Sequence, residues 1–192
     1  MRVGLGGPFT RTPCRLQSTV RSTLFWKTVT LDEANLLESF VSLLEEKGVS
    51  YCVVGGQAVN AYVEPLVSLD LDLVVAVEQL PELEKELSKR YRLERFPHSL
   101  NVSVPSSDLR IQIQMDPRYF PFVERAASRS LLGLTLPVAS LPDVLQGKVW
   151  AALDPNRRAS KRQKDLADIA RIVEARPELR GAVPAELLDR LL

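Results

Sequence analysis

A pair of glycines followed by two alternating aspartates constrains the fold of this chain more than any other feature of its sequence. Residues 51–54 form a short apolar run of β-forming residues that stops at Gly55-Gly56. Glycine permits backbone conformations and close approaches that larger residues do not. Residues 57–63 have the length of about two helical turns. The segment therefore predicts a strand, a glycine turn and a short helix.

The next part of this segment is an alternating strand that carries two carboxylates. Residues 69–73 read Leu-Asp-Leu-Asp-Leu, so Asp70 and Asp72 share one face of the predicted strand. Residues two apart on a strand are separated by roughly 6.5 to 7 Å, which lets both carboxylates reach one hard cation. Backbone N–H groups at a Gly-Gly turn suit a phosphate oxygen. Gly55, Gly56, Asp70 and Asp72 therefore predict a site for a metal-bound nucleoside triphosphate, although each half of the pattern alone is a common structural feature.

In combination, Gly55-Gly56 and the later Asp70-Leu71-Asp72-Leu73 resemble the signature of the DNA polymerase β nucleotidyltransferase superfamily. That signature is a pair of small residues, a short spacer, and then two acidic residues that alternate with apolar ones. The resemblance covers residues 31–175. Within the superfamily, the chain is similar to the minimal bacterial nucleotidyltransferases, which include the AbiE-type abortive-infection toxins. It implies an α+β fold with a mixed, mostly antiparallel sheet, packed helices and a helical C-terminal part.

The resemblance also implies an activity. The activity is transfer of a nucleoside monophosphate from an NTP to an acceptor hydroxyl, on a tRNA or a protein. It implies Mg²⁺ held by Asp70 and Asp72, with Mn²⁺ as the alternative, and for a toxin it implies a cognate antitoxin. A non-catalytic protein on the same fold that binds a nucleotide or a partner, and an antibiotic-modifying nucleotidyltransferase, are the alternatives.

Two further segments carry candidate site residues. The signals at Ser140 and at Asp154-Pro155 predict a helix between them, and this helix contains Lys148. The segment resembles the one from which minimal nucleotidyltransferase toxins project a lysine at the triphosphate; the alternative is a solvated helix lysine. Residues 164–169 resemble the last motif of the AbiE-type toxins, in which an acidic residue acts as base or metal partner. Asp165 is the first candidate for that role and Asp168 the second.

The alternating strand at residues 109–115 departs from the superfamily pattern. Catalytic members often carry a third carboxylate here, but the polar positions of this strand are Arg110, Gln112 and Gln114. Glutamine is a poor substitute for a carboxylate as a metal ligand. The departure leaves three alternatives open: one metal ion, a carboxylate recruited from elsewhere, or loss of the chemistry.

A basic run lies between the two C-terminal helices that the sequence predicts, and the second helix is expected over residues 163–174. The basic residues are Arg157, Arg158, Lys161, Arg162 and Lys164. They suit a phosphate-rich partner, either the nucleotide or an RNA backbone. The alternative is a solvated loop and helix start, partly balanced by nearby acidic residues. Elsewhere, a short helix is predicted over residues 120–127, and the single histidine, His98, is predicted to lie on the surface.

Composition separates the N-terminal residues from the rest. Residues 1–29 contain five basic residues and no acidic one, which predicts a disordered arm or a misassigned start codon, with a transit peptide as the alternative. Residues 30–192 are predicted to form a single nucleotidyltransferase-like domain whose first helix begins at Thr30, capped by Glu33.

The whole chain has the composition of an ordinary globular protein. Hydrophobic residues make up 45% of it, charged residues 26%, and its formal net charge is +1. No apolar run approaches the length of a membrane span, so membrane binding is not expected. Recognition of a DNA sequence is not expected either. Cys14 and Cys52 are far apart, which favours the cytoplasm and a core position for Cys52.

Overall fold

The computed structural model describes residues 35–191 of the chain. The predicted arm at residues 1–29 lies outside the described residues, and so does the predicted helix cap formed by Thr30 and Glu33. None of the helices among residues 35–191 has the length and apolar character needed to span a lipid bilayer.

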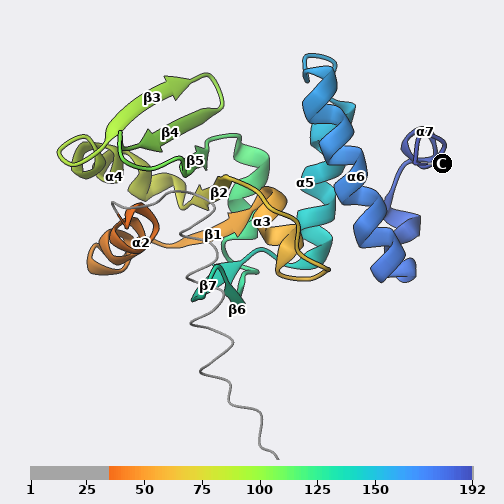
Figure 1. Cartoon of the computed structure of the whole chain (residues 1–192), viewed down its shortest axis with the longest axis horizontal. Helices are drawn as coiled ribbons and strands as arrows, with labels where there is room; N and C mark the ends of the chain where they lie inside the picture. The colour runs from red at the N-terminus through yellow and green to blue at the C-terminus, as the bar shows by residue number, and fades with distance from the viewer. Residues whose placement is uncertain (1–34, 192) are drawn as a thin grey trace, which may run out of the picture.

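The described residues contain one seven-stranded sheet with the strand order β3-β4-β5-β2-β1-β7-β6 (Figure 1). The strands are β1 (Tyr51–Val54), β2 (Asp70–Val75), β3 (Arg92–Phe96), β4 (Ser99–Ser103), β5 (Arg110–Gln114), β6 (Ala127–Leu131) and β7 (Leu134–Val138). The β1–β7 and β2–β5 pairs are parallel, and the other pairs are antiparallel. The mixed, mostly antiparallel sheet that the resemblance implied is therefore confirmed.

Helices cover both sides of this sheet. They are α2 (Leu36–Glu46), α3 (Gly55–Asn60), α4 (Leu80–Leu87), α5 (Leu141–Leu153), α6 (Ala159–Ala175) and α7 (Ala185–Leu188), with 3₁₀ helices η1 (Val77–Gln79), η2 (Pro117–Phe122) and η3 (Pro177–Ala182). In Figure 1, α5 and α6 lie side by side on one side of the strands, and α2 and α4 lie on the other. The short helix α3 packs against β2, α5 and α6. The helical C-terminal part is thus present as expected.

The ends of α5 and α6 determine what the C-terminal helices present to the sheet. Helix α5 begins after Ser140, whose hydroxyl accepts a hydrogen bond from the Asp143 N–H, and it ends before Asp154, as the sequence predicted. Helix α6 begins at Ala159, four residues before the predicted start at residue 163. Most of the basic run is therefore helical rather than a loop, which fixes the positions of Lys161 and Lys164.

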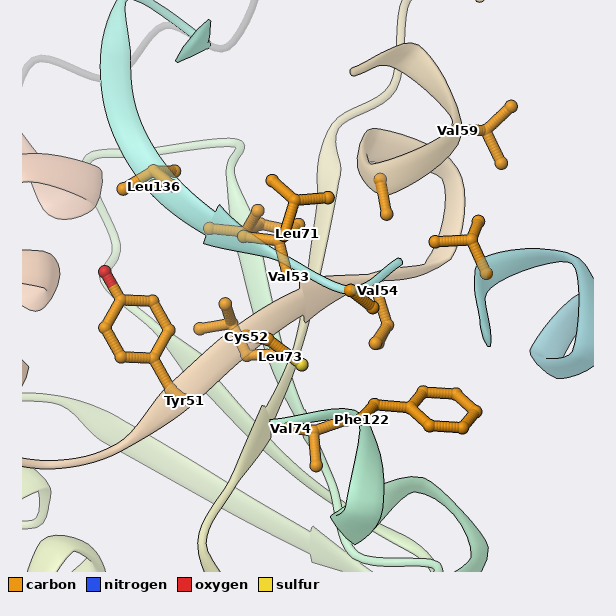
Figure 2. Close-up of a cluster of buried hydrophobic side chains, with 14 of the residues drawn as sticks. Tyr51, Cys52, Val53, Val54, Val59, Leu71, Leu73, Val74, Phe122 and Leu136 are labelled. Carbon is orange, nitrogen blue, oxygen red and sulfur yellow. The ribbon is translucent and has the colours of Figure 1, made fainter. Parts of the chain in front are cut away.

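The central strands β1 and β2 supply the middle of the hydrophobic core. All four residues of β1 are buried, because the strand is covered on both of its faces. In β2 the buried Leu71 and Leu73 alternate with half-buried Asp70 and Asp72. Figure 2 shows the core side chains around Cys52, which is fully buried as predicted. The alternation leaves both aspartates on the face that α5 and α6 cover.

The helix expected over residues 120–127 is wrong. The 3₁₀ helix η2 already covers residues 117–122 and ends in a turn, and the strand β6, which pairs with β7, begins at Ala127. Pro121 lies inside η2, and proline lacks the N–H that a continuing helix requires. Leu132 and Gly133 adopt positive φ values of 55° and 82°, which form the tight turn of the β6–β7 hairpin.

The environment of Cys52 makes its thiol unreactive in the folded chain. Burial, assisted by the charge of Asp143, raises the pKa of Cys52 to about 12. In a Cys14→Ser variant near pH 8, we expect a thiol reagent to label Cys52 on the order of a thousandfold more slowly than an unfolded cysteine, because so little thiolate is present. Labelling of the same variant in denaturant is the control. Equal rates in the two conditions would contradict the described core.

Candidate active site

A cavity of about 580 Å³ opens between the sheet and the helices α5 and α6. Its walls come from the β1–α3 turn, from β2, β4 and β5, from η2, and from both C-terminal helices. Six of the residues predicted from the sequence line it: Gly55, Gly56, Asp70, Asp72, Lys148 and Asp165. Asp168 is buried beside Lys148 rather than in the cavity wall. Segments far apart in the sequence therefore meet at one place.

The glycine turn touches the second aspartate directly. The antiparallel pairing of β1 with β2 places Val54 opposite Asp72, so the residue after Val54 lies beside that carboxylate. Gly55 has a φ of +67°, and a β-carbon added to it would lie 2.0 Å from Asp72 Oδ2. A β-carbon on Gly56 would meet no atom closer than 3.9 Å. Position 55 therefore requires glycine for its backbone conformation and for space, whereas position 56 does not.

The two aspartates have different electrostatic environments. Burial raises the pKa of Asp72; the charge of Lys148 opposes this rise, and the charge of Asp70 adds to it. Asp70 is nearer to solvent and has cations beside both oxygens. Its Oδ2 lies 3.4 Å from Lys161 Nζ, and its Oδ1 lies 3.8 Å from Arg110 Nε. The pair thus combines one desolvated carboxyl with one balanced by surface cations.

Asp70 and Asp72 fit a magnesium ion that a substrate helps to hold. Mg²⁺ is commonly bound by one or two carboxylates and keeps waters and substrate phosphates as its other ligands. Within the described part of the chain, no group of three or more histidine, cysteine, aspartate or glutamate side chains is placed to hold a metal ion. The two carboxylates lie on one face of β2, which agrees with the smaller donor set.

An amide occupies the position next to this pair on the neighbouring strand. Gln112 of β5 is in register with Asp72, and Gln114 is in register with Val74. Both glutamines line the cavity, so the strand that often carries a third carboxylate supplies none here. Asp116, just beyond β5, also lines the cavity, but Arg118 binds both of its oxygens.

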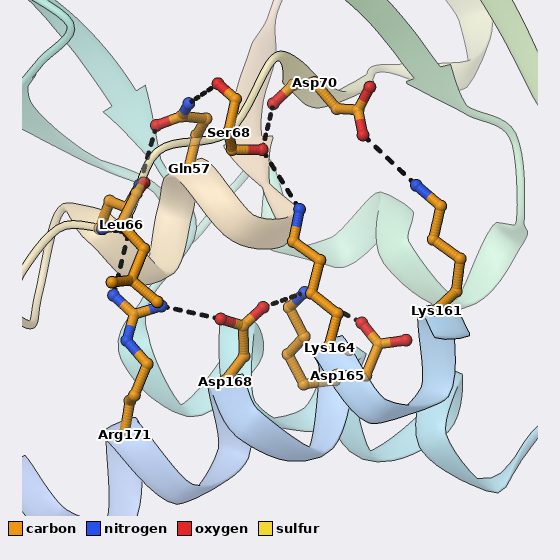
Figure 3. Close-up of polar contacts among 12 residues, drawn as sticks. Gln57, Leu66, Ser68, Asp70, Lys161, Lys164, Asp165, Asp168 and Arg171 are labelled. Carbon is orange, nitrogen blue, oxygen red and sulfur yellow. Dashed lines mark hydrogen bonds and ion pairs between the residues drawn. The ribbon is translucent and has the colours of Figure 1, made fainter. Parts of the chain in front are cut away.

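Lys148 is buried in a network of charges between α5 and α6. Its Nζ lies 3.0 Å from Asp165 Oδ1 and 2.6 Å from Asp168 Oδ2. Arg157 lies 2.8 Å from Asp165. Arg171 lies 2.8 Å from Asp168 (Figure 3). Burial favours a lower pKa for Lys148, but Asp168 and Asp165 together hold that pKa above its usual value. Lys148 is therefore charged, and it is not the solvated helix lysine considered from the sequence.

The basic run divides between the cavity and the loop that precedes α6. Lys161 reaches Asp70, and Lys164 Nζ lies 3.4 Å from the hydroxyl of Ser68 (Figure 3). Lys164 Nζ is also 4.0 Å from where a β-carbon of Gly56 would lie. Arg162 instead donates to backbone carbonyls of the loop, including that of Asp154. Helix α6 therefore brings two lysines to the cavity, Lys164 beside the glycine turn and Lys161 beside Asp70.

Sequence reasoning missed the aromatic wall of the cavity. Tyr119 and Phe122 of η2 and Trp150 of α5 line it. Tyr119 packs against Gly147, where a β-carbon would lie 2.9 Å from its ring, and its hydroxyl donates to the Gly147 carbonyl. Burial raises the pKa of Tyr119 to about 12, so this hydroxyl stays protonated. The predicted surface residue His98 is exposed, and it too lines the cavity.

Comparisons with known proteins agree with this arrangement. A family model described as "Nucleotidyl transferase AbiEii toxin, Type IV TA system" matches residues 54–192. No curated protein matches the chain significantly.

Two solved structures are similar in fold. The crystal structure of ANT(2″)-Ia in complex with adenylyl-2″-tobramycin has a TM-score of 0.59 at 15% identity, and the match covers 82% of this chain and 97% of that one. The solution structure of the antibiotic-resistance factor ANT(2″)-Ia has a TM-score of 0.51 at 12% identity, with 81% and 94% covered. At these identities the similarity shows the fold alone.

The contact between Gly55 and Asp72 predicts opposite outcomes for two neighbouring substitutions. Gly55→Ala should lower the free energy of unfolding by about 2 kcal/mol or more, because it combines a strained φ with a clash against Asp72. Gly56→Ala should change it by less than about 1 kcal/mol. Urea unfolding of both variants measures the difference. Similar values for the two would show that Asp72 is not packed on the glycine turn.

The charge network predicts that Lys148 contributes strongly to stability. Lys148→Met should cost about 3 kcal/mol, because it leaves two buried carboxylates with fewer cations. Lys161→Met is the matched control; its side chain is 42% exposed, and we expect a cost of at most about 1 kcal/mol. The two variants are compared by denaturant unfolding. A cost for Lys148→Met no greater than that of the control would argue against the buried network.

Proposed function

The chain belongs to the AbiEii nucleotidyltransferase toxin family, and we propose that it transfers a nucleoside monophosphate from an NTP to an acceptor hydroxyl on a tRNA or a protein. One observation carries the proposal: the glycine turn, the Asp70–Asp72 pair and the lysines of α6 line one cavity. Family membership supports the proposal that this chain is a toxin, that it acts in the cytoplasm, and that it has a cognate antitoxin.

The triphosphate would lie between the glycine turn and α6. The first N–H groups of a helix have no partner within the helix, and those of α3 come from Gly55 and Gly56. Lys164 approaches this turn from α6, and Lys161 lies beside Asp70 in the same cavity. Lysine acts as a point charge toward phosphate oxygens. The combination supports a phosphate site at the β1–α3 turn.

Asp70 and Asp72 would hold Mg²⁺, and Mn²⁺ suits the same ligands. When bound, the ion supplies a positive charge that stabilises the phosphate oxygens during transfer. Asp72 is held against Gly55, so its carboxylate is oriented before any ligand arrives. Lys161 lies at Asp70 and would exchange this carboxylate for phosphate oxygens when substrate binds.

Asp165 and Asp168 were candidates for a base or a metal partner. Cations contact both oxygens of each carboxylate, with Lys148 shared between them. Such engagement favours a positioning role over proton abstraction. We therefore propose that the two aspartates keep Lys148 charged and hold it at the cavity, within the electrostatic reach of Asp72.

The alternative is a non-catalytic binding protein that has kept the fold and lost the nucleotidyl-transfer activity. The observation that favours it is Gln112, an amide in register with Asp72 where a third carboxylate often lies. Transfer measured with a labelled NTP separates the two. Among acceptors, labelled RNA or protein would favour the toxin-type reaction, whereas a labelled aminoglycoside would indicate a small-molecule nucleotidyltransferase.

The decisive variant is Asp70→Asn/Asp72→Asn. We expect Mg²⁺-dependent transfer of labelled NMP to fall by at least about 100-fold, because both charged ligands become neutral amides. Asp108→Asn/Asp189→Asn removes the same charge from exposed positions outside the cavity wall and should retain transfer. Both variants should keep the wild-type circular dichroism. Transfer at the wild-type rate in the Asp70/Asp72 variant would rule out the proposed site.

A further inference from the structure

Arg118 forms part of an aromatic cluster in the cavity wall that the phosphate and metal sites do not use. Its guanidinium carbon lies over the ring of Trp150, 5.0 Å from the ring centroid. Trp150 stacks on Phe122 with ring centroids 5.8 Å apart and an interplanar angle of 12°. Tyr119 meets Trp150 edge to face at 5.4 Å. Packing on several sides therefore fixes the Trp150 ring, and the planar group of Arg118 rests on it.

Asp116 holds Arg118 by the edge of its guanidinium. Arg118 Nε donates to Asp116 Oδ2 at 3.0 Å, and Nη2 donates to the same oxygen at 2.6 Å. Asp116 Oδ1 also accepts from the backbone N–H of Arg118 at the start of η2. Hydrogen bonds of this kind lie in the plane of the guanidinium, so they occupy its edge and leave its two faces free.

With its guanidinium over the Trp150 ring and its edge bound by Asp116, Arg118 would present its remaining face to the cavity. The Arg118 side chain is 56% exposed and lines the cavity. A guanidinium with one face on an aromatic ring and its edge bound by a carboxylate is oriented in advance to stack a planar ring on its second face. We propose that this face of Arg118 stacks the nucleobase of the incoming nucleotide.

The inference rests on the proposed function. It requires a separation between the phosphate site and the base site, and the geometry of the sheet agrees with that separation. Gln112 of β5 is in register with Asp72, and Asp116 follows four residues later along nearly extended backbone. Four such residues span roughly 13 Å. The phosphates and the base of a nucleotide lie at its opposite ends. Phosphates near Asp72 and Lys164 would therefore place the base toward Asp116 and Arg118.

Trp150 lies on the other side of Arg118 from the proposed base site, so its emission reports on stacking through the guanidinium. The chain has two tryptophans, so Trp26→Phe leaves Trp150 as the only one. In that background and without any acceptor, each Mg²⁺–NTP that binds should quench Trp150 emission in a saturable way. Mg²⁺–tripolyphosphate should compete with the nucleotide without quenching, because it has no ring. Quenching of equal depth by tripolyphosphate would overturn the inference.

Calorimetry on matched variants tests Arg118 itself. Arg118→Ala and Arg118→Lys should each weaken NTP binding by roughly tenfold, because both remove the planar group, and should leave tripolyphosphate binding within about twofold. Arg129→Ala is the control. The guanidinium carbon of Arg129 lies 4.0 Å from the centroid of the Tyr62 ring, outside the cavity wall, so this substitution should change neither affinity. Thermal melting checks that every variant is folded.

The outcomes separate the inference from the function on which it rests. Wild-type NTP affinity in Arg118→Lys would show that charge alone matters and would overturn stacking, as would equal losses for NTP and tripolyphosphate in Arg118→Ala. A wild-type chain that binds tripolyphosphate as tightly as every NTP would overturn the base site and leave the phosphate site standing. A wild-type chain that binds neither would overturn both.

Discussion

The backbone of Gly55 lies against the carboxylate of Asp72, and the arrangement of the site depends on this contact. The pairing of β1 with β2 brings the end of one strand opposite the acidic position of the other. Because the chain turns at Gly55 with a left-handed φ, α3 begins directly beside that carboxylate. The turn and the acidic strand are therefore one structural unit. Their separation in the sequence reflects the short helix and loop that return the chain antiparallel to β1.

A second constraint acts between α5 and α6, where charge rather than apolar packing joins the helices beside the cavity. Moving a lysine and two aspartates out of water is costly, and the cost is recovered only when every charge has partners in good geometry. Arg157 and Arg171 supply the partners that Lys148 alone cannot. The same helix that contributes the aspartates also carries Lys161 and Lys164 toward the cavity. The register of α6 on α5 therefore sets the buried network and the exposed cations together.

The parts of this structure that sequence reasoning predicted depend on local signals. The Gly-Gly turn and the Asp-Leu-Asp alternation lie within one short segment, and the ends of α5 are marked by Ser140 and Pro155. The burial of Lys148 was not predictable in this way, because its partners lie on another helix. The aromatic wall was missed for the same reason: Arg118 and Trp150 are brought together by the β6–β7 hairpin between them, and the exposed residues of β6 gave no strand pattern. The resemblance to a family placed Lys148 and Asp165 in one site, but it did not show that they form an ion pair.

The buried network also limits how a chain of this kind can change over generations. Lys148 serves two aspartates, and each aspartate serves a second cation, so the five side chains form a continuous series of alternating charge. Loss of any inner member leaves a neighbouring charged side chain buried without one of its partners. A lineage that passes through single substitutions therefore meets a fitness barrier at these positions. We expect related chains to keep the whole set or to have exchanged several of its members together.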